Sequence, residues 1–411
     1  MFFITFYSAL TVLINSFVYV IIKKTTKSED LILTKKNRDV SLDIIRTLAF
    51  LLVVSVHFFL NSGFYDVPVY GKTMYLLSVI CSNCMICVPL FLLLSGYLMG
   101  GKTVSKKYYL GISKVLIIYV LASAFSLIYK EAYLGQDYSL KSGILATLNY
   151  TGADYSWYIE MYIGLFLMIP FLNVLYNNLN THKQKLILIG SLLFLTGLPG
   201  VLNSFDFYTE GFFSNPAANV NYFNPLIPDW WENLYPFTYY FAGRYLKEYG
   251  IGIKLKFRIP LFFGIGIIVG TYNFYRSFGA GFIRTIYNYF PSVFNFILAV
   301  LLFSIPKEIK FKKPDGRIAG IFALCSDLSL GGYLVSSVFD NFFYENFKKI
   351  IPVFENRVIY APVMIILVFI SSLTVSFVIN VFYNMICDFA AKTKNLLSKK
   401  DRSENKKAVS M

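Results

Sequence analysis

The chain has 411 residues, of which 56% are hydrophobic, 18% aromatic and only 15% charged. Soluble domains usually carry about 25% charged residues, and apolar runs of about 20 residues recur along this chain. This composition excludes a water-soluble globular protein and predicts an all-α polytopic membrane protein. The net charge of +15 would also suit a nucleic-acid partner, but its distribution over the loops favours the lipid bilayer as the partner, and we expect no nucleic acid.

The first apolar segment covers residues 3–22, and Lys23, Lys24 and Lys27 follow it. A secretory signal carries its positive charge before the apolar run. We therefore expect residues 1–37 to form an uncleaved anchor helix and a basic cytoplasmic linker. A mis-assigned start is the alternative.

Ten further apolar runs predict the core of the protein. We expect spans near residues 42–62, 74–100, 108–130, 156–178, 186–203, 231–250, 259–276, 290–305, 317–345 and 358–386. The predicted fold is a bundle of ten core transmembrane helices plus one extra N-terminal helix. Residues 38–386 would form one membrane domain, and residues 387–411 a basic cytoplasmic tail.

The basic residues lie unevenly among the loops of this predicted bundle. Most of the 38 Lys and Arg residues fall in loops that alternate onto one side, whereas the long loop at 204–230 has none. Because cytoplasmic loops are enriched in Lys and Arg, we expect the 23–41 segment and the C-terminal tail to lie in the cytoplasm.

Three cysteines in "CSNCMIC", Cys81, Cys84 and Cys87, lie within one predicted span. Such spacing can mark a metal site, but no fourth Cys or His lies nearby in the sequence. Small residues commonly form helix contacts in membranes. We therefore favour packing and expect no metal.

The span at 42–62 carries Asp43, Arg46 and His57, although charge inside a membrane is costly. His57 is eleven positions after Arg46, so both lie on one stripe of a helix, about 16 Å apart along its axis. Val53 completes the stripe. Two polar groups on one face at different depths indicate the wall of a channel or cleft. Alternatively, Arg46 snorkels to the interface or pairs with Asp43, and His57 is an interior histidine bonded to a neighbouring hydroxyl.

The run "RDVSLDIIRTLAFLLVVSVHFF" resembles the first core helix of acyltransferase family 3, which are bacterial envelope O-acyltransferases with ten core spans. The family signature is a Leu-Asp pair, then an Arg, ten residues and a His, and Leu42, Asp43, Arg46 and His57 match it. Four further matches follow in chain order: "VPLFLLLSGYLM", "SWYIEMYIGLFLMIPFLN", "YPFTYYFAGRYL" and "LSLGGYLVSS".

The chain departs from the family pattern at two helices. The third helix usually starts with Arg-x-x-Arg, where this chain has Gly111 and Lys114, and lysine lacks the bidentate fork of arginine. The ninth helix tends to carry a His, where this chain has Ser336.

The resemblance implies transfer of an acyl group, most often acetyl, from cytoplasmic acyl-CoA to a sugar hydroxyl. The acceptor would be a cell-envelope polysaccharide such as an O-antigen, capsule, exopolysaccharide or wall glycan, and the enzyme would lie in the bacterial cytoplasmic membrane. Acetyl-CoA or another acyl-CoA would be the donor substrate.

Within this expected reaction, Arg46 would bind a phosphate group of the donor. Positive charge at the same cytoplasmic entrance for the donor would come from Lys106, Lys107 and Lys114. His57 would act as general base or carry the acyl group. The other histidine, His182, falls in a charged loop and is predicted to be uninvolved.

Further candidates have weaker claims. Glu160 would orient His57, bind acceptor hydroxyls or pair structurally. Trp157 and Tyr158 would stack on the sugar or belong to the interfacial aromatic belt, and Ser95 and Tyr119 would supply hydrogen bonds to substrate.

Two rival functions remain open. A transporter or flippase for a lipid-linked glycan would use the polar stripe as a path, although no inverted repetition of broken helices is evident in the sequence. A non-catalytic partner of a polysaccharide synthase would fit the departures at Gly111, Lys114 and Ser336.

Overall fold

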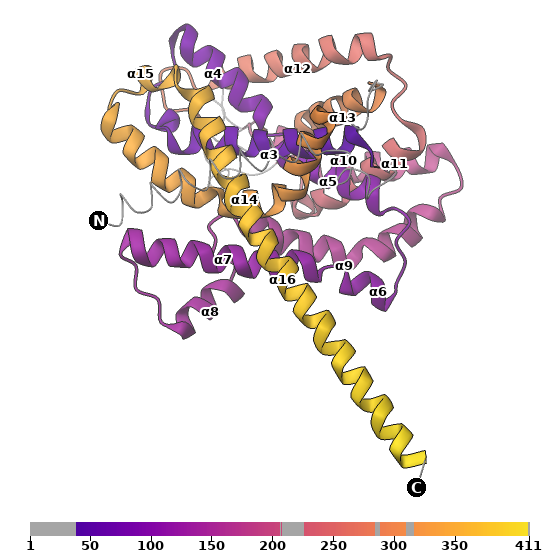
Figure 1. Ribbon diagram of the computed structural model, residues 1–411. Coiled ribbons are helices and arrows are strands. Elements are labelled where there is room, and N and C mark those ends of the chain that lie inside the picture. The colour runs from indigo at the N-terminus through magenta and orange to yellow at the C-terminus, as the bar shows by residue number, and fades with distance from the viewer. Residues whose placement is uncertain (1–37, 206, 208–225, 284–287, 310–315, 410–411) are drawn as a thin grey trace.

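The computed structural model describes residues 38–205, 207, 226–283, 288–309 and 316–409, and it describes side chains up to residue 393. The anchor helix predicted at 3–22 and most of the loop 204–230 lie outside these residues. Helices form nearly all of the regular structure (Figure 1). They are α3 (Val40–Asn61), η1 (Phe64–Asp66), α4 (Gly71–Cys84), α5 (Cys87–Met99), α6 (Lys106–Leu110), α7 (Ser113–Leu134), α8 (Leu140–Leu148), α9 (Trp157–Asn177), α10 (His182–Leu202), η3 (Glu232–Leu234), α11 (Tyr235–Tyr249), α12 (Leu255–Arg276), α13 (Val293–Glu308), α14 (Arg317–Ile350), α15 (Phe354–Val358) and α16 (Ala361–Val409).

Eight helical segments of the described residues are long and apolar enough to cross a membrane. The multi-pass, all-helical class is therefore confirmed. Helices α11 and α13 lie where two more spans are predicted, but they have only 15 and 16 residues. The count of ten core spans plus one stays a prediction.

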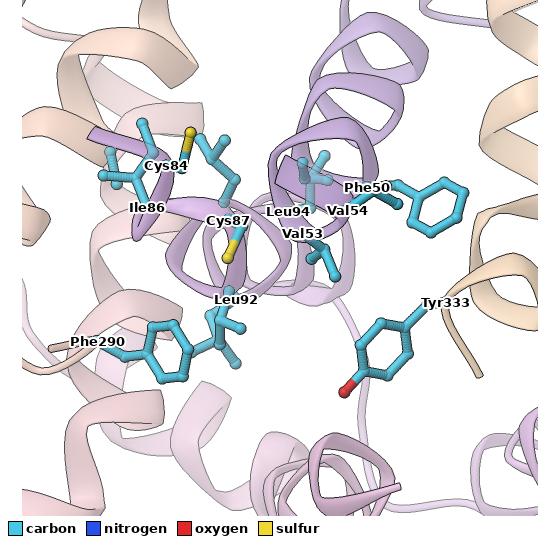
Figure 2. Packing of buried hydrophobic residues seen from close by; sticks show 14 of the residues in the cluster. Phe50, Val53, Val54, Cys84, Ile86, Cys87, Leu92, Leu94, Phe290 and Tyr333 are labelled. Atoms are coloured by element: carbon cyan, nitrogen blue, oxygen red, sulfur yellow. The ribbon is translucent and has the colours of Figure 1, made fainter. Parts of the chain in front are cut away.

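The span predicted as one helix at 74–100 is broken in the middle, between α4 and α5. Pro89 lacks an N–H and its ring clashes with the carbonyl four residues earlier. That residue is Met85, the C-cap of α4. Cys81, Cys84 and Cys87 flank the break and are buried, and Figure 2 shows Cys84 and Cys87 among apolar side chains such as Ile86 and Leu92.

Helices α3 and α14 run in the same direction at the centre of the bundle. Their first halves meet where Arg46 donates a hydrogen bond to Ser326, and their second halves meet where His57 lies against Asp340. Between these contacts, Gly332 packs closely on the ring of Phe50. Helix α14 also packs against α16, which crosses it and then runs out of the bundle to the C-terminus (Figure 1).

Segments predicted to lie on one side of the membrane meet at one end of the bundle. Lys307 pairs with Asp39, and Arg38 pairs with Asp327, so the chain before α3 contacts both the end of α13 and the start of α14. Lys114 at the start of α7 lines the same cavity as Arg46. These contacts agree with the prediction that successive loops alternate between the two sides of the membrane. The assignment of this end of the bundle to the cytoplasm rests on the positive charge of its loops.

Helices α5 and α11 cross at two glycines that let their backbones touch. A Cβ added at Gly96 would lie 1.9 Å from the carbonyl oxygen of Tyr240, and one added at Gly243 would lie 2.1 Å from that of Leu93. Close backbone approach at small residues is the usual way in which membrane helices gain packing energy. This contact fixes α5, which forms one wall of the cavity described below.

Replacing either glycine by alanine will therefore push the two helices apart. We expect Gly96→Ala and Gly243→Ala each to lower the free energy of unfolding by about 1–3 kcal/mol, the usual range for overpacking. Thermal unfolding of the detergent-solubilised protein measures this effect. The matched control is Gly190→Ala on α10, where nothing lies within 4 Å of an added Cβ; an equal loss of stability there would contradict the account.

Candidate functional site

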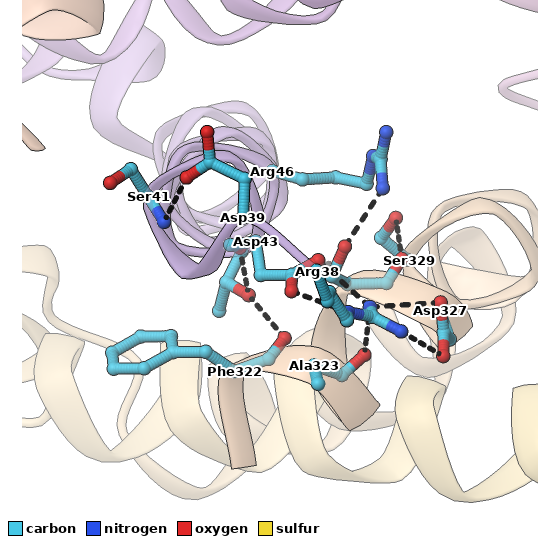
Figure 3. A network of polar contacts seen from close by, with 11 residues as sticks. Arg38, Asp39, Ser41, Asp43, Arg46, Phe322, Ala323, Asp327 and Ser329 are labelled. Carbon is cyan, nitrogen blue, oxygen red and sulfur yellow. Dashed lines mark hydrogen bonds and ion pairs between the residues drawn. The ribbon is translucent and has the colours of Figure 1, made fainter. Parts of the chain in front are cut away.

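A network of charged groups at the start of α3 is organised by Arg38 (Figure 3). Its guanidinium contacts both oxygens of Asp43, at 2.5 and 2.8 Å, and both oxygens of Asp327, at 2.9 and 3.0 Å. It also donates to the carbonyl oxygen of Ala323. The hydrogen bond to Asp43 raises the pKa of the Arg38 guanidinium. Arg38 thus binds two carboxylates and ties α3 to α14.

Arg46 is consequently left without a carboxylate at ion-pair distance among the described residues. The sequence offered a pairing of Arg46 with Asp43, but Asp43 is held by Arg38 instead. Arg46 donates a hydrogen bond from Nη1 to the hydroxyl oxygen of Ser326, 2.9 Å away. A guanidinium that is mostly buried and has only a hydroxyl partner is well placed to bind an anion.

A cavity of about 310 Å³ begins beside Arg46 and runs along α3. Arg46, Lys114, Ser326 and Asp327 line one part of it, which we call the Arg46 end. Apolar side chains from α5, α7 and α14 line its middle. Val53 is seven residues after Arg46 on the same face of α3, so it lies towards the other end of the cavity. Tyr158 and Tyr333 line that end with it. Of the stripe predicted on α3, Arg46 and Val53 therefore face a cavity, whereas His57 lies outside its lining.

His57 lies one helical turn beyond Val53 and is paired with an acid. Its Nδ1 is 3.1 Å from Oδ2 of Asp340 on α14. The distance is that of an ion pair, but neither His57 Nδ1 nor Asp340 Oδ1 has a hydrogen-bond partner among the described residues. The two groups are therefore close together, but no hydrogen bond joins His57 Nδ1 to the acid in this geometry. Both residues are buried, with 8% and 1% of their surfaces exposed.

Tyr155 completes this group. Its ring lies against the imidazole of His57 with centroids 3.9 Å apart, and its hydroxyl donates to Oδ2 of Asp340 at 2.9 Å. Burial raises the pKa of the Tyr155 phenol well above its usual range, so the hydroxyl stays protonated and remains a donor. Tyr155 thereby holds the carboxylate beside Nδ1, and Nε2 is the ring nitrogen that does not lie beside the acid.

The loop before α9 is anchored so that it carries Tyr155 into this position. Lys130 on α7 is buried and pairs with Asp154, at 2.5 Å, while also donating to the carbonyl oxygen of Thr151. From the other side, the hydroxyl of Tyr333 donates to the carbonyl oxygen of Tyr155 at 2.5 Å. Residues from α7, α14 and the loop itself thus fix one aromatic ring over His57.

The structure brings several predicted site residues to the cavity and leaves others apart. Arg46, Ser95, Lys114 and Tyr158 line it. Ser95 also donates to the carbonyl oxygen of Phe91 in its own helix.

The other predicted residues lie elsewhere. Lys106 and Lys107 are exposed at the start of α6, and Glu160 is exposed on α9, outside the cavity lining. Trp157 stacks on Phe290, and the hydroxyl of Tyr119 donates to the carbonyl oxygen of Thr147.

The acid beside His57 is Asp340, which the sequence analysis did not select. A signal was present, because Asp340 is an ionisable residue inside the predicted span 317–345, and such residues are usually functional. Tyr155 and Arg38 were missed for another reason. Their partners are distant in the sequence, and only the folded bundle brings them together.

The comparisons with known proteins identify the family of the chain. The family model for the acyltransferase 3 family, described as an acyltransferase domain, matches residues 39–381. The match covers most of the chain, so the protein belongs to acyltransferase family 3 and is a membrane acyltransferase. No curated protein and no solved structure matches the chain.

Removal of Arg38 will leave the buried carboxylate of Asp43 unpaired. We expect Arg38→Ala to lower the free energy of unfolding by about 3 kcal/mol. This value is at the lower end of the range for breaking a buried ion pair, because Arg38 keeps some contact with solvent. The double variant Arg38→Ala/Asp43→Asn should recover most of that loss. Thermal unfolding in detergent measures both.

The control is Arg317→Ala at the exposed start of α14, which should change stability by less than about 0.5 kcal/mol. If Arg38→Ala behaves like Arg317→Ala, the network does not hold α3 to α14.

Proposed function

We propose that this acyltransferase moves an acyl group, most often acetyl, from acyl-CoA to a sugar hydroxyl of a cell-envelope polysaccharide. The observation that carries the proposal is the placement of two functional groups on one helix. Arg46, with no acid partner at ion-pair distance among the described residues, lies at one end of a cavity. His57, paired with Asp340, lies one turn beyond the other end.

The Arg46 end suits the donor. Phosphate or pyrophosphate oxygens would accept charge-assisted hydrogen bonds from the guanidinium. Lys114 adds a second cation on the cavity wall. The apolar middle of the cavity would then hold the uncharged arm of acyl-CoA, directing its thioester towards His57. The exposed Lys106 and Lys107 would contribute to the positive field outside the cavity.

His57 would act as general base through Nε2. As the acceptor oxygen bonds to the acyl carbon, its proton passes to the imidazole and the C–S bond of the thioester breaks. The CoA thiolate then takes the proton from His57, which returns the enzyme to its starting state. Asp340 stabilises the imidazolium that forms between these steps. Asp340 and Tyr155 are therefore positioning residues, and His57 is the catalytic residue.

The acceptor would approach from the side opposite to the donor. His57 lies in the last turns of α3, four residues before the helix ends at Asn61, so its imidazole is near the membrane boundary opposite the Arg46 end. A sugar hydroxyl at that boundary can reach Nε2 without crossing the bilayer. Trp157, exposed at the start of α9, is available for contact with the sugar.

Loss of the imidazole should abolish most of the transfer. We expect His57→Ala to lower kcat by about 10²- to 10⁴-fold, the usual contribution of a positioned general base. Asp340→Asn should also lower kcat, but by a smaller factor, because asparagine keeps the shape of the side chain and removes its charge. Release of CoA thiol by the purified protein, supplied with acetyl-CoA and envelope glycan, measures both.

Full transferase activity in His57→Ala would refute the catalytic role of His57. A covalent acyl group found on His57 by mass spectrometry would replace the base mechanism with an acyl carrier. If wild-type protein releases no thiol but moves labelled glycan across vesicles, the protein is a transporter instead.

Arg46→Ala tests the donor end separately. We expect the KM for acetyl-CoA to rise roughly 10- to 100-fold, which corresponds to the loss of about 1.5–3 kcal/mol from a charge-assisted hydrogen bond. The KM for glycan should change little, because Arg46 lies about 16 Å from His57 along the helix. A selective rise in the glycan KM would contradict the assignment.

A further inference from the structure

Two tyrosine rings line the end of the cavity nearest to His57. Tyr158 comes from α9 and Tyr333 from α14, and their rings meet edge to face with centroids 5.8 Å apart. Tyr333 is 7% exposed, and its hydroxyl is fixed by the carbonyl oxygen of Tyr155. Figure 2 shows the ring of Tyr333 reaching in from α14, across from Val53 on α3. We call Tyr158 and Tyr333 the tyrosine pair.

The tyrosine pair lies between the cavity and the catalytic histidine. Both tyrosines line the cavity, whereas His57 and Asp340 do not. On α14, Tyr333 is seven residues before Asp340 and seven after Ser326, so the three residues share one stripe about two turns apart. On α3, Val53 is one turn before His57, or about 6 Å along the axis. An acyl group entering from the Arg46 end meets these two rings immediately before it meets the imidazole.

From this placement we infer that the tyrosine pair sets the length of the acyl group that the enzyme transfers, admitting acetyl and excluding longer chains. The inference rests on the proposed function. Closely packed interiors do not accept added methylene groups without displacement of their neighbours. Here the neighbours are rigid rings, one of them held by its hydrogen bond to the backbone. The bonds made and broken stay those of the proposed reaction, with the thioester C–S bond exchanged for an ester C–O bond and the acceptor proton passed through His57 to the thiolate.

The test compares acetyl-CoA, butyryl-CoA and hexanoyl-CoA as donors for the purified full-length protein with envelope glycan. Wild-type protein should favour acetyl-CoA. Tyr333→Ala should raise the ratio of kcat/KM for butyryl-CoA over acetyl-CoA by about tenfold or more, the scale on which closed apolar pockets discriminate single methylene groups. Tyr158→Ala should shift the ratio in the same direction, and it provides the test if Tyr333→Ala fails to fold.

Two matched variants separate chain-length selection from general loosening of the bundle. Tyr333→Phe keeps the ring and removes only the hydrogen bond to Tyr155, so acetyl preference should persist. Tyr162→Ala removes a tyrosine that also lines the cavity, one turn along α9 from Tyr158 towards the Arg46 end, where its hydroxyl contacts the sulfur of Met99. The chain-length ratio of this variant should equal that of wild type.

The inference fails if Tyr333→Ala and Tyr158→Ala transfer acetyl with unchanged chain-length ratios, or if Tyr162→Ala shifts the ratio equally. It also fails if wild-type protein uses hexanoyl-CoA as well as acetyl-CoA. Absence of transfer by wild type from all three donors would instead refute the proposed function. The two failures are therefore distinguishable in one experiment.

Discussion

A charged side chain inside a bilayer is costly unless another group meets it, and in this protein that constraint is met along the contact between α3 and α14. Arg38 satisfies Asp43 and Asp327 at the beginning of the two helices, and Asp340 lies against His57 towards their ends. The helices run in the same direction, so their polar residues meet at the same depths. Because Arg38 binds both acids, Arg46 faces the cavity and makes no ion pair among the described residues. The geometry of the whole candidate site follows from this one pairing.

The rest of the bundle holds the α3–α14 contact and shapes the cavity beside it. Helix α5 forms a wall whose position depends on the glycine crossing with α11. Helix α7 contributes Lys114 at one end and anchors the Tyr155 loop through Lys130 at the other. In the proposed reaction, the donor and acceptor therefore meet at a point that several helices fix independently. Tyr158 and Tyr333 line the cavity where it comes nearest to His57, and we infer that they select the acyl group there.

Sequence reasoning predicted the features that depend on local pattern. The all-helical membrane class, the stripe of Arg46, Val53 and His57, and the order of the family motifs all follow from spacing along the chain. The break between α4 and α5 was equally local, since Pro89 is visible in the sequence, but a continuous apolar run concealed it. Helix α11 is shorter than the span predicted at 231–250, because η3 (Glu232–Leu234) precedes it. Helix α13 has the length of the span predicted at 290–305, but it begins and ends three residues later.

Contacts between distant segments could not be predicted in the same way. Asp43 is one turn from Arg46 and was therefore its obvious partner, yet Arg38 reaches it from outside the helix. Glu160 was the acid chosen to assist His57, but it is exposed on α9 and lies outside the cavity lining. Asp340 takes the place beside the imidazole because α14 runs parallel to α3. Only the relative position of those two helices identifies the acid.

The central claim is that the donor enters at the Arg46 end and that the acyl group leaves at the His57 end. Labelling of glycan in sealed membrane vesicles from cells that express the protein tests it most directly. With acetyl-labelled acetyl-CoA added outside, inverted vesicles expose the predicted donor side and should incorporate label into carbohydrate, whereas right-side-out vesicles should not. His57→Ala should abolish the signal. Equal labelling in both orientations, or labelling only in right-side-out vesicles, would contradict the account.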